Sequence, residues 1–348
     1  MRVVLLTPLF LPVRGGTEVH VYNLAKHLTK MGVSVEVHTS RDTYTQRSVL
    51  PEREVIDGLE VIRHKSGWGV EGDYDLLHFH NMHRLLTYWN VKTVLHAVLS
   101  SDKKVFTPHH SMIPDRPYPV RALQKLLVNK FDRWIAVSEW EKEEMQSKGF
   151  SVKNAVVIPN GVEDEAFELP PQGPVVEGKY LLYLGRISPE KNQLWAIRCI
   201  KGWESPVKLV LAGEVRDESY FAEVKRELNE RVMYMGKVDQ RTKYVLIDNA
   251  LAVVLTSTIE AEGIAVKEAF VRGTPAIVAK WSGGATSLIR DGYNGFLVGN
   301  CEEFRKAVEE VSERREEMSK NAREGTDAFR WDNVAKRTLE VYREVLME

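Results

Sequence analysis

The chain of 348 residues contains only two cysteines, Cys199 and Cys301. Two thiols cannot build a framework of several disulfides, and they are too few for a zinc site made of thiolate ligands. The scarcity of cysteine therefore argues against a small disulfide-stapled secreted domain. It favours a reducing, cytoplasmic compartment.

The chain also lacks a surplus of either charge, with 48 Lys and Arg against 49 Asp and Glu. Binding to a nucleic-acid backbone needs a basic surplus that displaces counterions. We therefore expect no nucleic-acid partner. The charged share of 28%, together with few cysteines, suggests a heat-adapted source.

Long hydrophobic runs are absent as well, since no apolar stretch approaches the roughly 20 residues that span a bilayer. The opening segment, residues 1–13, combines one arginine with an apolar run, as a signal peptide does. Pro8, Pro12 and the lack of a cleavage site with small residues argue against that interpretation. We expect a buried first strand instead.

Short β-branched runs alternate with helical patterns along the whole chain, which is typical of parallel sheets with crossover helices. The apolar spacing of Glu18–Met31 predicts a helix that Gly32 ends, and long helices are expected at 301–323 and 331–347. The predicted strands are Val3–Thr7, Val33–Thr39, Leu59–His64, Leu76–His80, Lys104–Thr107, Trp134–Val137, Ala155–Ile158, Tyr180–Leu184, Val207–Ala212, Val232–Met235, Ala252–Thr256, Pro275–Ala279 and Gly295–Val298.

Residues 160–179 interrupt this alternation with prolines, glycines and an acidic cluster, and they are interpreted as a linker. A fresh strand pattern opens at Tyr180, and the alternation then restarts. The fold class we predict is α/β, with two Rossmann-like doubly wound domains, residues 1–165 and 175–330.

Ligands of open parallel sheets bind beyond the carboxyl ends of the strands, so the loops at those ends deserve inspection. The first loop contains Gly15 and Gly16, whose amides lie beside a helix N-terminus, where anions are favoured. The pattern is not G-x-G-x-x-G, so a nicotinamide-dependent dehydrogenase loses its main support. A simple turn remains the alternative for a glycine pair.

Histidines are missing from the last 238 residues, because all ten lie within residues 20–110. His109 and His110 follow a predicted strand, where they either face a ligand or lie in solvent. His78 and His80 end another strand and share one of its faces. Without cysteine or a zinc-binding spacing, we expect packing there and no metal site.

A third loop carries two cations, Arg186 and Lys191, across a turn in which Pro189 starts a helix. Cations beside a helix N-terminus suit a pyrophosphate, because arginine binds it with two parallel hydrogen bonds and lysine acts as a point charge. The alternative is a solvated turn with incidental charges.

A fourth loop leads from an apolar strand into a helix and carries Glu260 and Glu268. Carboxylates at such a strand end accept hydrogen bonds from vicinal hydroxyls, as an acidic residue does for ribose in other nucleotide folds. Gly263 allows the amides near Ile264 to approach a phosphate or a sugar. Glu262 is interpreted as a charge that complements the helix dipole.

Seven short motifs follow one another along the chain, each degenerate alone but specific in this order. They are Gly15–Glu18, Thr107-x-His109, Ala136–Glu139, Ile158–Gly161, Gly185-Arg186 with Lys191-Asn192, Glu260-x7-Glu268, and Gly283-Gly284 with Asp291-Gly292-x-x-Gly295. By these motifs the chain resembles the family 4 glycosyltransferases of the GT-B fold, over essentially its full length.

The resemblance implies two domains that face a central cleft, with the helix of residues 331–348 returning to complete the first domain. It implies a hexosyltransferase of carbohydrate biosynthesis that moves a sugar from a nucleotide-diphosphate sugar to an acceptor, with retention of configuration. The acceptor would be a sugar, a lipid-linked sugar or a small molecule. No cofactor and no metal would be required.

The resemblance also implies roles for the second half. Arg186 and Lys191 would hold the diphosphate, and Glu268 would bind the ribose hydroxyls. Glu260 would bind the donor sugar together with the amides of Gly263, Ile264 and Ala265. Charge develops on the bridging oxygen as the glycosidic bond breaks, and two fixed cations beside a helix N-terminus would stabilise that charge without a metal.

In the first half, the resemblance implies that Gly15 and Gly16 close over the phosphates and that His109 reaches the reacting sugar. The chain departs from the family pattern at two places. Ala261–Gly263 stands where Gly-Phe-Gly is common, and Thr286-Ser287 stands where a Pro-Glu pair is common. These departures leave the identity of the donor sugar open.

Other enzyme classes stay open as alternatives. A GT-A enzyme would use an Asp-x-Asp metal site, and Asp73-Tyr-Asp75 fits that formula, but it precedes a strand of the first half and the two-domain pattern disfavours it. A GT-B-fold sugar-nucleotide epimerase would bind a similar donor without an acceptor. A non-catalytic subunit would bind a sugar nucleotide and transfer nothing.

The segment Arg121–Arg133 places cations beside an apolar stripe. An interfacial helix there would give the N-terminal domain a peripheral contact with the inner face of the membrane. The mixed charges favour a scaffold helix that packs on the sheet. We therefore expect a cytoplasmic protein, with peripheral membrane contact as the alternative.

Overall fold

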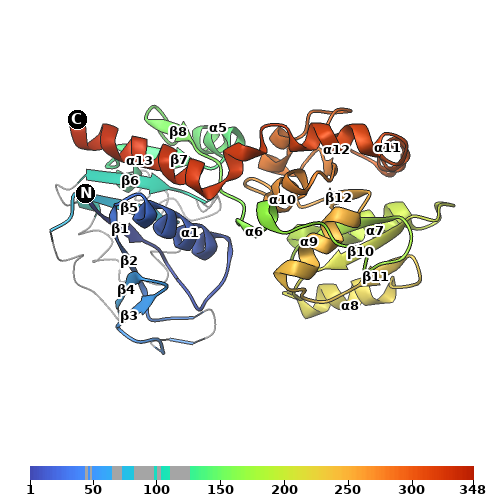
Figure 1. The fold of residues 1–348 in the computed structure, drawn as a ribbon, viewed down its shortest axis with the longest axis horizontal. Helices are drawn as coiled ribbons and strands as arrows, with labels where there is room; N and C mark the ends of the chain where they lie inside the picture. Colours follow the sequence, from blue (N-terminus) through green and yellow to red (C-terminus); the bar gives the residue numbers. More distant parts are fainter. Residues whose placement is uncertain (44–45, 48, 65–72, 82–97, 100–102, 110–125) are drawn as a thin grey trace. The chain divides into compact units, whose positions relative to one another are not determined.

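The computed structural model describes the chain except for residues 44–45, 48, 65–72, 82–97, 100–102 and 110–125. The chain divides into two units, Met1–Gly161 with Trp331–Glu348, and Val162–Arg330. Each unit is built on its own sheet with helices against it (Figure 1). The prediction of two α/β domains with parallel sheets is confirmed.

The first unit contains an eight-stranded sheet in the order β3-β4-β2-β1-β5-β6-β7-β8. All neighbouring strands are parallel except β3 and β4, which form an antiparallel hairpin at the edge. The strands are β1 (Arg2–Leu6), β2 (Ser34–Ser40), β3 (Arg53–Ile56), β4 (Leu59–His64), β5 (Leu76–His80), β6 (Lys103–Thr107), β7 (Arg133–Ala136) and β8 (Ala155–Val157).

Strand β3 was not predicted from the sequence. Its residues are exposed or half-buried, so the strand carries no apolar run that would predict it. The hairpin turn between β3 and β4 consists of Asp57 and Gly58, both with positive φ, at 49° and 83°. Asp-Gly is a preferred pair for such two-residue turns, and this was the available signal.

Two helices far apart in the sequence pack together in the first unit, α1 (Gly16–Lys30) and α13 (Trp331–Met347) (Figure 1). Leu24 and Leu28 of α1 share one hydrophobic cluster with Tyr342 and Val345 of α13. The C-terminal helix therefore completes the core of the first unit. A further helix, α5 (Glu139–Ser147), follows β7.

The second unit contains a six-stranded, fully parallel sheet in the order β11-β10-β9-β12-β13-β14. The predicted strands are confirmed, with bounds shifted by at most one residue. They are β9 (Tyr180–Leu184), β10 (Lys208–Ala212), β11 (Val232–Tyr234), β12 (Ala252–Leu255), β13 (Ala276–Ala279) and β14 (Gly295–Val298).

One long helix was expected at residues 301–323, but the chain turns at Arg314 and forms two helices, α11 (Cys301–Glu313) and α12 (Arg315–Arg323). After the turn, Met318 is buried in the same core cluster as Phe304 of α11. The unit's helices are α6 (Glu165–Glu168), η1 (Pro189–Lys191), α7 (Gln193–Ile200), α8 (Glu218–Arg226), α9 (Gln240–Asn249), α10 (Ile264–Arg272), η2 (Gly283–Leu288), α11 (Cys301–Glu313), α12 (Arg315–Arg323) and η3 (Thr326–Phe329).

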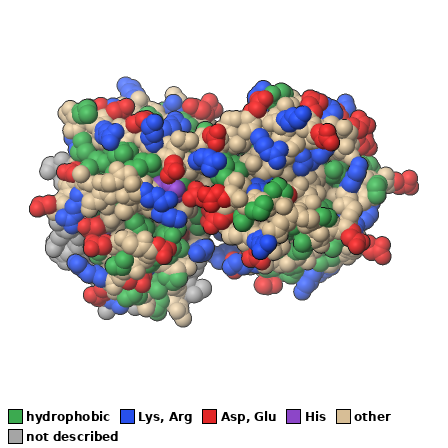
Figure 2. Space-filling model, in the orientation of Figure 1, with side chains coloured by type: hydrophobic (Ala, Val, Ile, Leu, Met, Phe, Trp, Pro, Cys, Tyr) green, Lys and Arg blue, Asp and Glu red, His purple; other side chains and the backbone are tan. Residues whose placement is uncertain are grey.

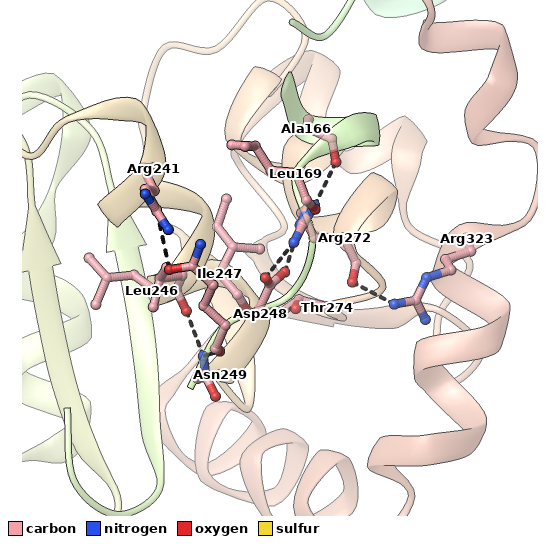
Figure 3. Close-up of polar contacts among 12 residues, drawn as sticks. Ala166, Leu169, Arg241, Leu246, Ile247, Asp248, Asn249, Arg272, Thr274 and Arg323 are labelled. Atoms are coloured by element: carbon pink, nitrogen blue, oxygen red, sulfur yellow. Dashed lines mark hydrogen bonds and ion pairs between the residues drawn. The ribbon is translucent and has the colours of Figure 1, made fainter. Parts of the chain in front are cut away.

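The linker expected at residues 160–179 is in large part a packed segment of the second unit, which starts at Val162. Helix α6 lies within this segment, and Arg272 of α10 donates hydrogen bonds to the carbonyls of Ala166 and Leu169 at 3.0 and 2.6 Å (Figure 3). The prolines, glycines and acidic residues of this segment predicted a linker without packing. Instead, hydrogen bonds from Arg272, which is distant in the sequence and buried, hold the segment in place.

The two cysteines form a disulfide, which corrects the expectation of free thiols in a reducing compartment. Cys199 lies near the end of α7, Cys301 begins α11, and 102 residues separate them. Two helices that lie apart in the chain pack against each other, which brings the thiols together. The sequence offered no signal for this pairing.

Lysine and arginine side chains are interspersed with aspartate and glutamate over both units on the face drawn in Figure 2. This mixture agrees with the net charge of −1. Among the described residues, none of the helices combines the length and the apolar character that crossing a membrane requires.

Candidate functional site

The loop after β9 presents a cation at the carboxyl edge of the second sheet. Arg186 is exposed, and its guanidinium has no ion-pair partner among the residues that the structure describes. The amide of Gln193 donates to the Arg186 carbonyl at 2.8 Å, which fixes the backbone there. An exposed, unpaired guanidinium on a fixed backbone can receive an anion with little rearrangement.

Lys191 and Glu260 were predicted as site residues on two separate loops, and the structure joins them. The Nζ of Lys191 lies 2.6 Å from Oε2 of Glu260, and the two side chains are 17% and 16% exposed. The Thr258 amide donates to the Glu190 carbonyl at 2.8 Å, so the loops after β9 and β12 are tied together. A cation and a carboxylate are thus held at the same edge of the sheet.

Helix α10 begins beside this pair. Gly263 is its N-cap with φ of 85°, and a Cβ at this position would lie 2.7 Å from the Cβ of Ala285. Only glycine suits both the left-handed backbone and the close approach. No side chain among the described residues caps the helix, so its first amides, those of Ile264 and Ala265, carry the partial positive charge of the N-terminus.

The loop that follows β13 packs on the same place, because the Gly284 amide donates to the Glu260 carbonyl at 2.8 Å. The Gly283-Gly284 motif therefore supports the Glu260 loop. Three loops of the second unit, after β9, β12 and β13, meet at one edge of its sheet.

Glu268 lies in α10, where it is 10% exposed and pairs with Lys243 of α9 at 2.5 Å. Sequence reasoning missed Lys243. Its Nζ also lies 3.8 Å from Glu163 and 4.5 Å from the centre of the Tyr244 ring. A lysine on the surface of a predicted helix carries no local signal for this role, because its partners come from other elements.

Glu262 was interpreted as a charge at the start of a helix, and this is wrong. Its side chain is 4% exposed and pairs with Lys267, which is fully buried. The ammonium of Lys267 lies 4.7 Å from the centre of the Phe329 ring, and burial lowers the pKa of Lys267 well below its usual value. The pair is a buried polar contact beneath the loop.

The glycine pair of the first unit lies where the sequence placed it, at the start of α1. Gly15 is the N-cap with an extended backbone, and Gly16 is the first helical residue. A Cβ at Gly16 would have nothing within 4 Å in the described structure. Among the described residues, Gly16 therefore leaves open space beside the helix N-terminus.

His109 follows β6 with a left-handed backbone, φ 52°. Its Nε2 lies 3.1 Å from Nδ1 of His80, the last residue of β5, and its ring meets the His20 ring edge-on. Burial lowers the pKa of His80 and of His109 well below the usual value. Both rings are therefore neutral near pH 7. His110 lies outside the described residues.

Two further residues join this group, and sequence reasoning did not assign them to it. Nδ1 of His20 lies 2.5 Å from Oδ1 of Asn160, and the His20 ring contacts Trp331. Asn160 belongs to the motif Ile158–Gly161, so the motif was the available signal. Gly161 lies directly against Trp331, where a Cβ would come within 2.4 Å of the indole ring.

His78 has a structural role in the first unit. Its Nδ1 lies 2.6 Å from the hydroxyl of Tyr342, and its Nε2 lies 2.8 Å from Oγ1 of Thr107. Its ring also lies beside that of His80, tilted by 39°, with the ring centres 4.0 Å apart. Both nitrogens are used in hydrogen bonds within the first unit.

Asp73-Tyr-Asp75 lies before β5, at the opposite end of the strand from His80. Oδ2 of Asp75 accepts a hydrogen bond from the Arg2 amide at 2.8 Å. These carboxylates therefore lie away from the carboxyl edge, which argues against an Asp-x-Asp metal site.

The segment proposed as an amphipathic helix is described only in part, because residues 121–125 lie outside the described residues. Leu127, Val128 and Phe131 are buried in a hydrophobic cluster of the first unit. This part of the segment packs on the protein.

Comparison with known proteins agrees across both units. Residues 14–166 match the family described as Glycosyltransferase Family 4, and residues 164–325 match Glycosyl transferases group 1. An uncharacterized glycosyltransferase of Methanocaldococcus jannaschii is 27% identical, over 94% of each chain. The phosphatidyl-myo-inositol mannosyltransferase of Mycobacterium leprae is 26% identical, over 99% of this chain and 97% of its own.

Solved structures share the fold over nearly the whole chain. Anabaena HepE, solved in complex with UDP and glucose, has a TM-score of 0.78 at 20% identity and covers 99% of this chain and 100% of its own. Sucrose-phosphate synthase from Thermosynechococcus elongatus has a TM-score of 0.77 at 19% identity, with 99% of each chain covered.

Proposed function

We propose that this chain, which belongs to the family 4 glycosyltransferases, transfers a hexosyl group from a nucleotide-diphosphate sugar to an acceptor with retention of anomeric configuration. One observation carries the proposal: Arg186, Lys191 and Glu260 lie at the carboxyl edge of one parallel sheet, where α10 begins. Structures with this fold include HepE complexes with UDP and with UDP-glucose, which supports a nucleotide-sugar donor.

The leaving group of such a reaction is a nucleoside diphosphate, on which negative charge develops as the glycosidic bond breaks. Arg186 would bind the diphosphate through parallel hydrogen bonds, and Lys191 would add a second cation. The amides of Ile264 and Ala265 would supply partial positive charge from the start of α10. These groups supply the stabilisation that the reaction needs, and the proposal involves no cofactor or metal.

The ion pair of Lys191 and Glu260 has a role in this scheme. A diphosphate would draw the ammonium of Lys191 toward itself and release the Glu260 carboxylate. Glu260 would then accept hydrogen bonds from hydroxyls of the donor sugar. Glu268, held by Lys243, would accept hydrogen bonds from the ribose hydroxyls in the same way.

The first unit would contribute to the same reaction, as the resemblance implies. His109 would act on the donor sugar, and the amides at Gly15 and Gly16 would bind phosphate oxygens at the start of α1. Nε2 of the neutral His109 ring contacts His80, so Nδ1 is the nitrogen that would form a hydrogen bond with a sugar hydroxyl.

We assign the acceptor to sugars, lipid-linked sugars or small molecules. The relative named for phosphatidyl-myo-inositol supports a lipid-linked acceptor. A cytoplasmic enzyme with a peripheral contact to the inner face of the membrane fits such an acceptor, and absence of binding to anionic vesicles at low salt would exclude the contact. One disulfide is compatible with the cytoplasm of a heat-adapted organism.

Calorimetry with a panel of UDP-, GDP- and ADP-sugars tests the donor. We expect saturable binding of at least one of them. We expect Lys191→Ala to lower the transfer rate by about 10²–10³-fold, the usual effect of losing one preorganised donor to a developing charge. The control is Lys201→Ala, because Lys201 forms an exposed pair with Glu227 elsewhere in the second unit.

Failure of every sugar nucleotide to bind the folded chain would overturn the proposal. Incubation of the chain with the donor but no acceptor distinguishes a glycosyltransferase from a sugar-nucleotide epimerase, because only an epimerase would convert the donor to an isomer.

A further inference from the structure

Three histidines from separate elements meet at the carboxyl edge of the first sheet. His20 lies in α1, His80 ends β5, and His109 follows β6. One ring nitrogen of each lies within 4.8 Å of a ring nitrogen of the other two. Nδ1 of His80 lies 3.1 Å from Nε2 of His109.

These distances suit a shared cation. Zn–N bonds of about 2.0–2.1 Å in a tetrahedral site place two ligand nitrogens roughly 3.3 Å apart. The separation of 3.1 Å between His80 and His109 is already close to this value. The widest separation exceeds it by at most about 1.5 Å, which rotation of one ring can cover.

The surroundings orient the rings as ligands. The Asn160 carbonyl oxygen can only accept, so the bond to it places the proton of His20 on Nδ1 and leaves the lone pair on Nε2. Partners of this kind commonly orient metal-binding histidines through the other ring nitrogen. Asn160 thus fixes the orientation of the His20 ring, as the hydrogen-bond partners of metal-binding histidines do.

His80 differs from its neighbour His78 in the way its nitrogens are used. Nε2 of His80 is buried and has no hydrogen-bond partner within the described part of the chain. The ring as a whole is 0% exposed. Its other nitrogen, Nδ1, lies 3.1 Å from Nε2 of His109, so Nδ1 is the atom through which His80 would bind an ion together with His109.

We propose that His20, His80 and His109 bind one divalent transition-metal ion of the Zn²⁺ type, with the fourth position open. Three imidazoles without a carboxylate or thiolate favour Zn²⁺, Cu²⁺ or Ni²⁺ over Mg²⁺ or Ca²⁺, which take oxygen ligands. The site lies wholly in the first unit and does not rest on the proposed transfer reaction. Where His109 serves that reaction, the ion competes with the sugar and inhibits transfer.

The test is titration of the metal-stripped, purified full chain with Zn²⁺ in calorimetry and with Co²⁺ in absorption spectroscopy. We expect one equivalent to bind, and the Co²⁺ complex to show the intense visible bands of a tetrahedral site. We expect His80→Gln and His20→Gln to weaken binding about a hundredfold or more, and Asn160→Ala to weaken it about 10–100-fold.

Matched variants guard against loss of folding. His109→Asn retains a residue type that tolerates the left-handed backbone at φ 52°, and we expect it to fold and to lose the metal. His64→Asn disrupts the other close histidine pair, His64–His38 at 3.0 Å, and should bind one equivalent like the parent. Circular dichroism reports the fold of each variant.

A folded parent chain that binds no Zn²⁺ would overturn the proposal, and so would a folded His109→Asn chain that binds it as tightly as the parent. Metal binding is measured without donor, and donor binding is measured with a chelator. A failure of the metal-site proposal can therefore be distinguished from a failure of the proposed transfer function.

Discussion

Arg272 shows how a single side chain organises the second unit. It binds Asp248 through two hydrogen bonds, at 2.6 and 2.5 Å, and also donates to two carbonyls of the segment around α6 (Figure 3). Both side chains of the ion pair are nearly buried, at 6% and 9% exposed. A buried guanidinium that donates four hydrogen bonds acts as a structural crosslink between α9, α10 and α6.

Asp248→Asn should lower the free energy of unfolding of the second unit by about 3–5 kcal/mol, because it leaves the charge of Arg272 buried without its counterion. Urea denaturation measures the loss. The matched control is Glu324→Gln, since Glu324 pairs with Arg290 at 3.3 Å and both are more than half exposed. We expect a loss of less than about 1 kcal/mol there. Equal losses in the two variants would contradict the argument.

His38 makes the stability of the first unit depend on pH. Burial, followed by the charge of His64, lowers the pKa of His38 to about 4. The unfolded chain has the ordinary value of roughly 6.5, so it takes up the proton first as the pH falls. His38 should therefore contribute no slope to the free energy of unfolding above pH 6.5, and should lower that free energy toward pH 4 by up to about 1.4 kcal/mol per pH unit.

Urea denaturation of the parent and of His38→Gln between pH 8 and pH 4.5 checks this prediction. The variant should have a smaller slope below pH 6.5. A variant with the same slope as the parent would show that His38 does not contribute.

At the scale of elements, the disulfide joins α7 and α11. Both helices cover one core cluster, to which Cys199 contributes a fully buried side chain. Closing a loop of about 100 residues stabilises a folded state by up to roughly 4.7 kcal/mol in the chain-entropy account. The cross-link is thus a major contributor to the stability of the second unit.

Reduction with a phosphine should lower the melting temperature of the parent chain. Cys199→Ala combined with Cys301→Ala should melt lower than the parent and show no response to the reductant. Differential scanning calorimetry measures both. Two titratable thiols in the untreated, denatured chain would contradict the cross-link.

The whole molecule consists of two units, the first of which is assembled from both ends of the chain. Trp331 begins the returning helix, is 2% exposed, and lies against Gly161 and His20. Tyr342 on the same helix is fully buried and bonds to His78. The first unit therefore needs the last residues of the chain for its core.

Trp331→Ala should lower the free energy of unfolding of the first unit by about 3–5 kcal/mol, as large-to-small changes in a core do. The transition of the second unit should stay in place, because its core is its own. Calorimetry that resolves the two transitions measures this. Met347→Ala on the same helix is the control, since Met347 is 85% exposed and should change neither transition.

The amino-acid sequence by itself determined the alternation of strands and helices in both units. It also determined the family, and it predicted the two sets of loops that carry the proposed site residues. The spacing of apolar residues, the helix-capping residues and the order of the motifs are properties of the sequence, so they could be recognised without the tertiary structure. Thirteen of the described strands were predicted in this way, while β3 was missed because its exposed residues have no apolar period.

Tertiary structure alone decided which residues meet. The pairing of Lys191 with Glu260, of Glu268 with Lys243 and of Glu262 with Lys267 joins residues whose contact no local pattern encodes. The same holds for the disulfide and for the three histidines. The physical reason is that hydrogen bonds and ion pairs act over a few ångströms, so they depend on how the sheet brings distant loops together.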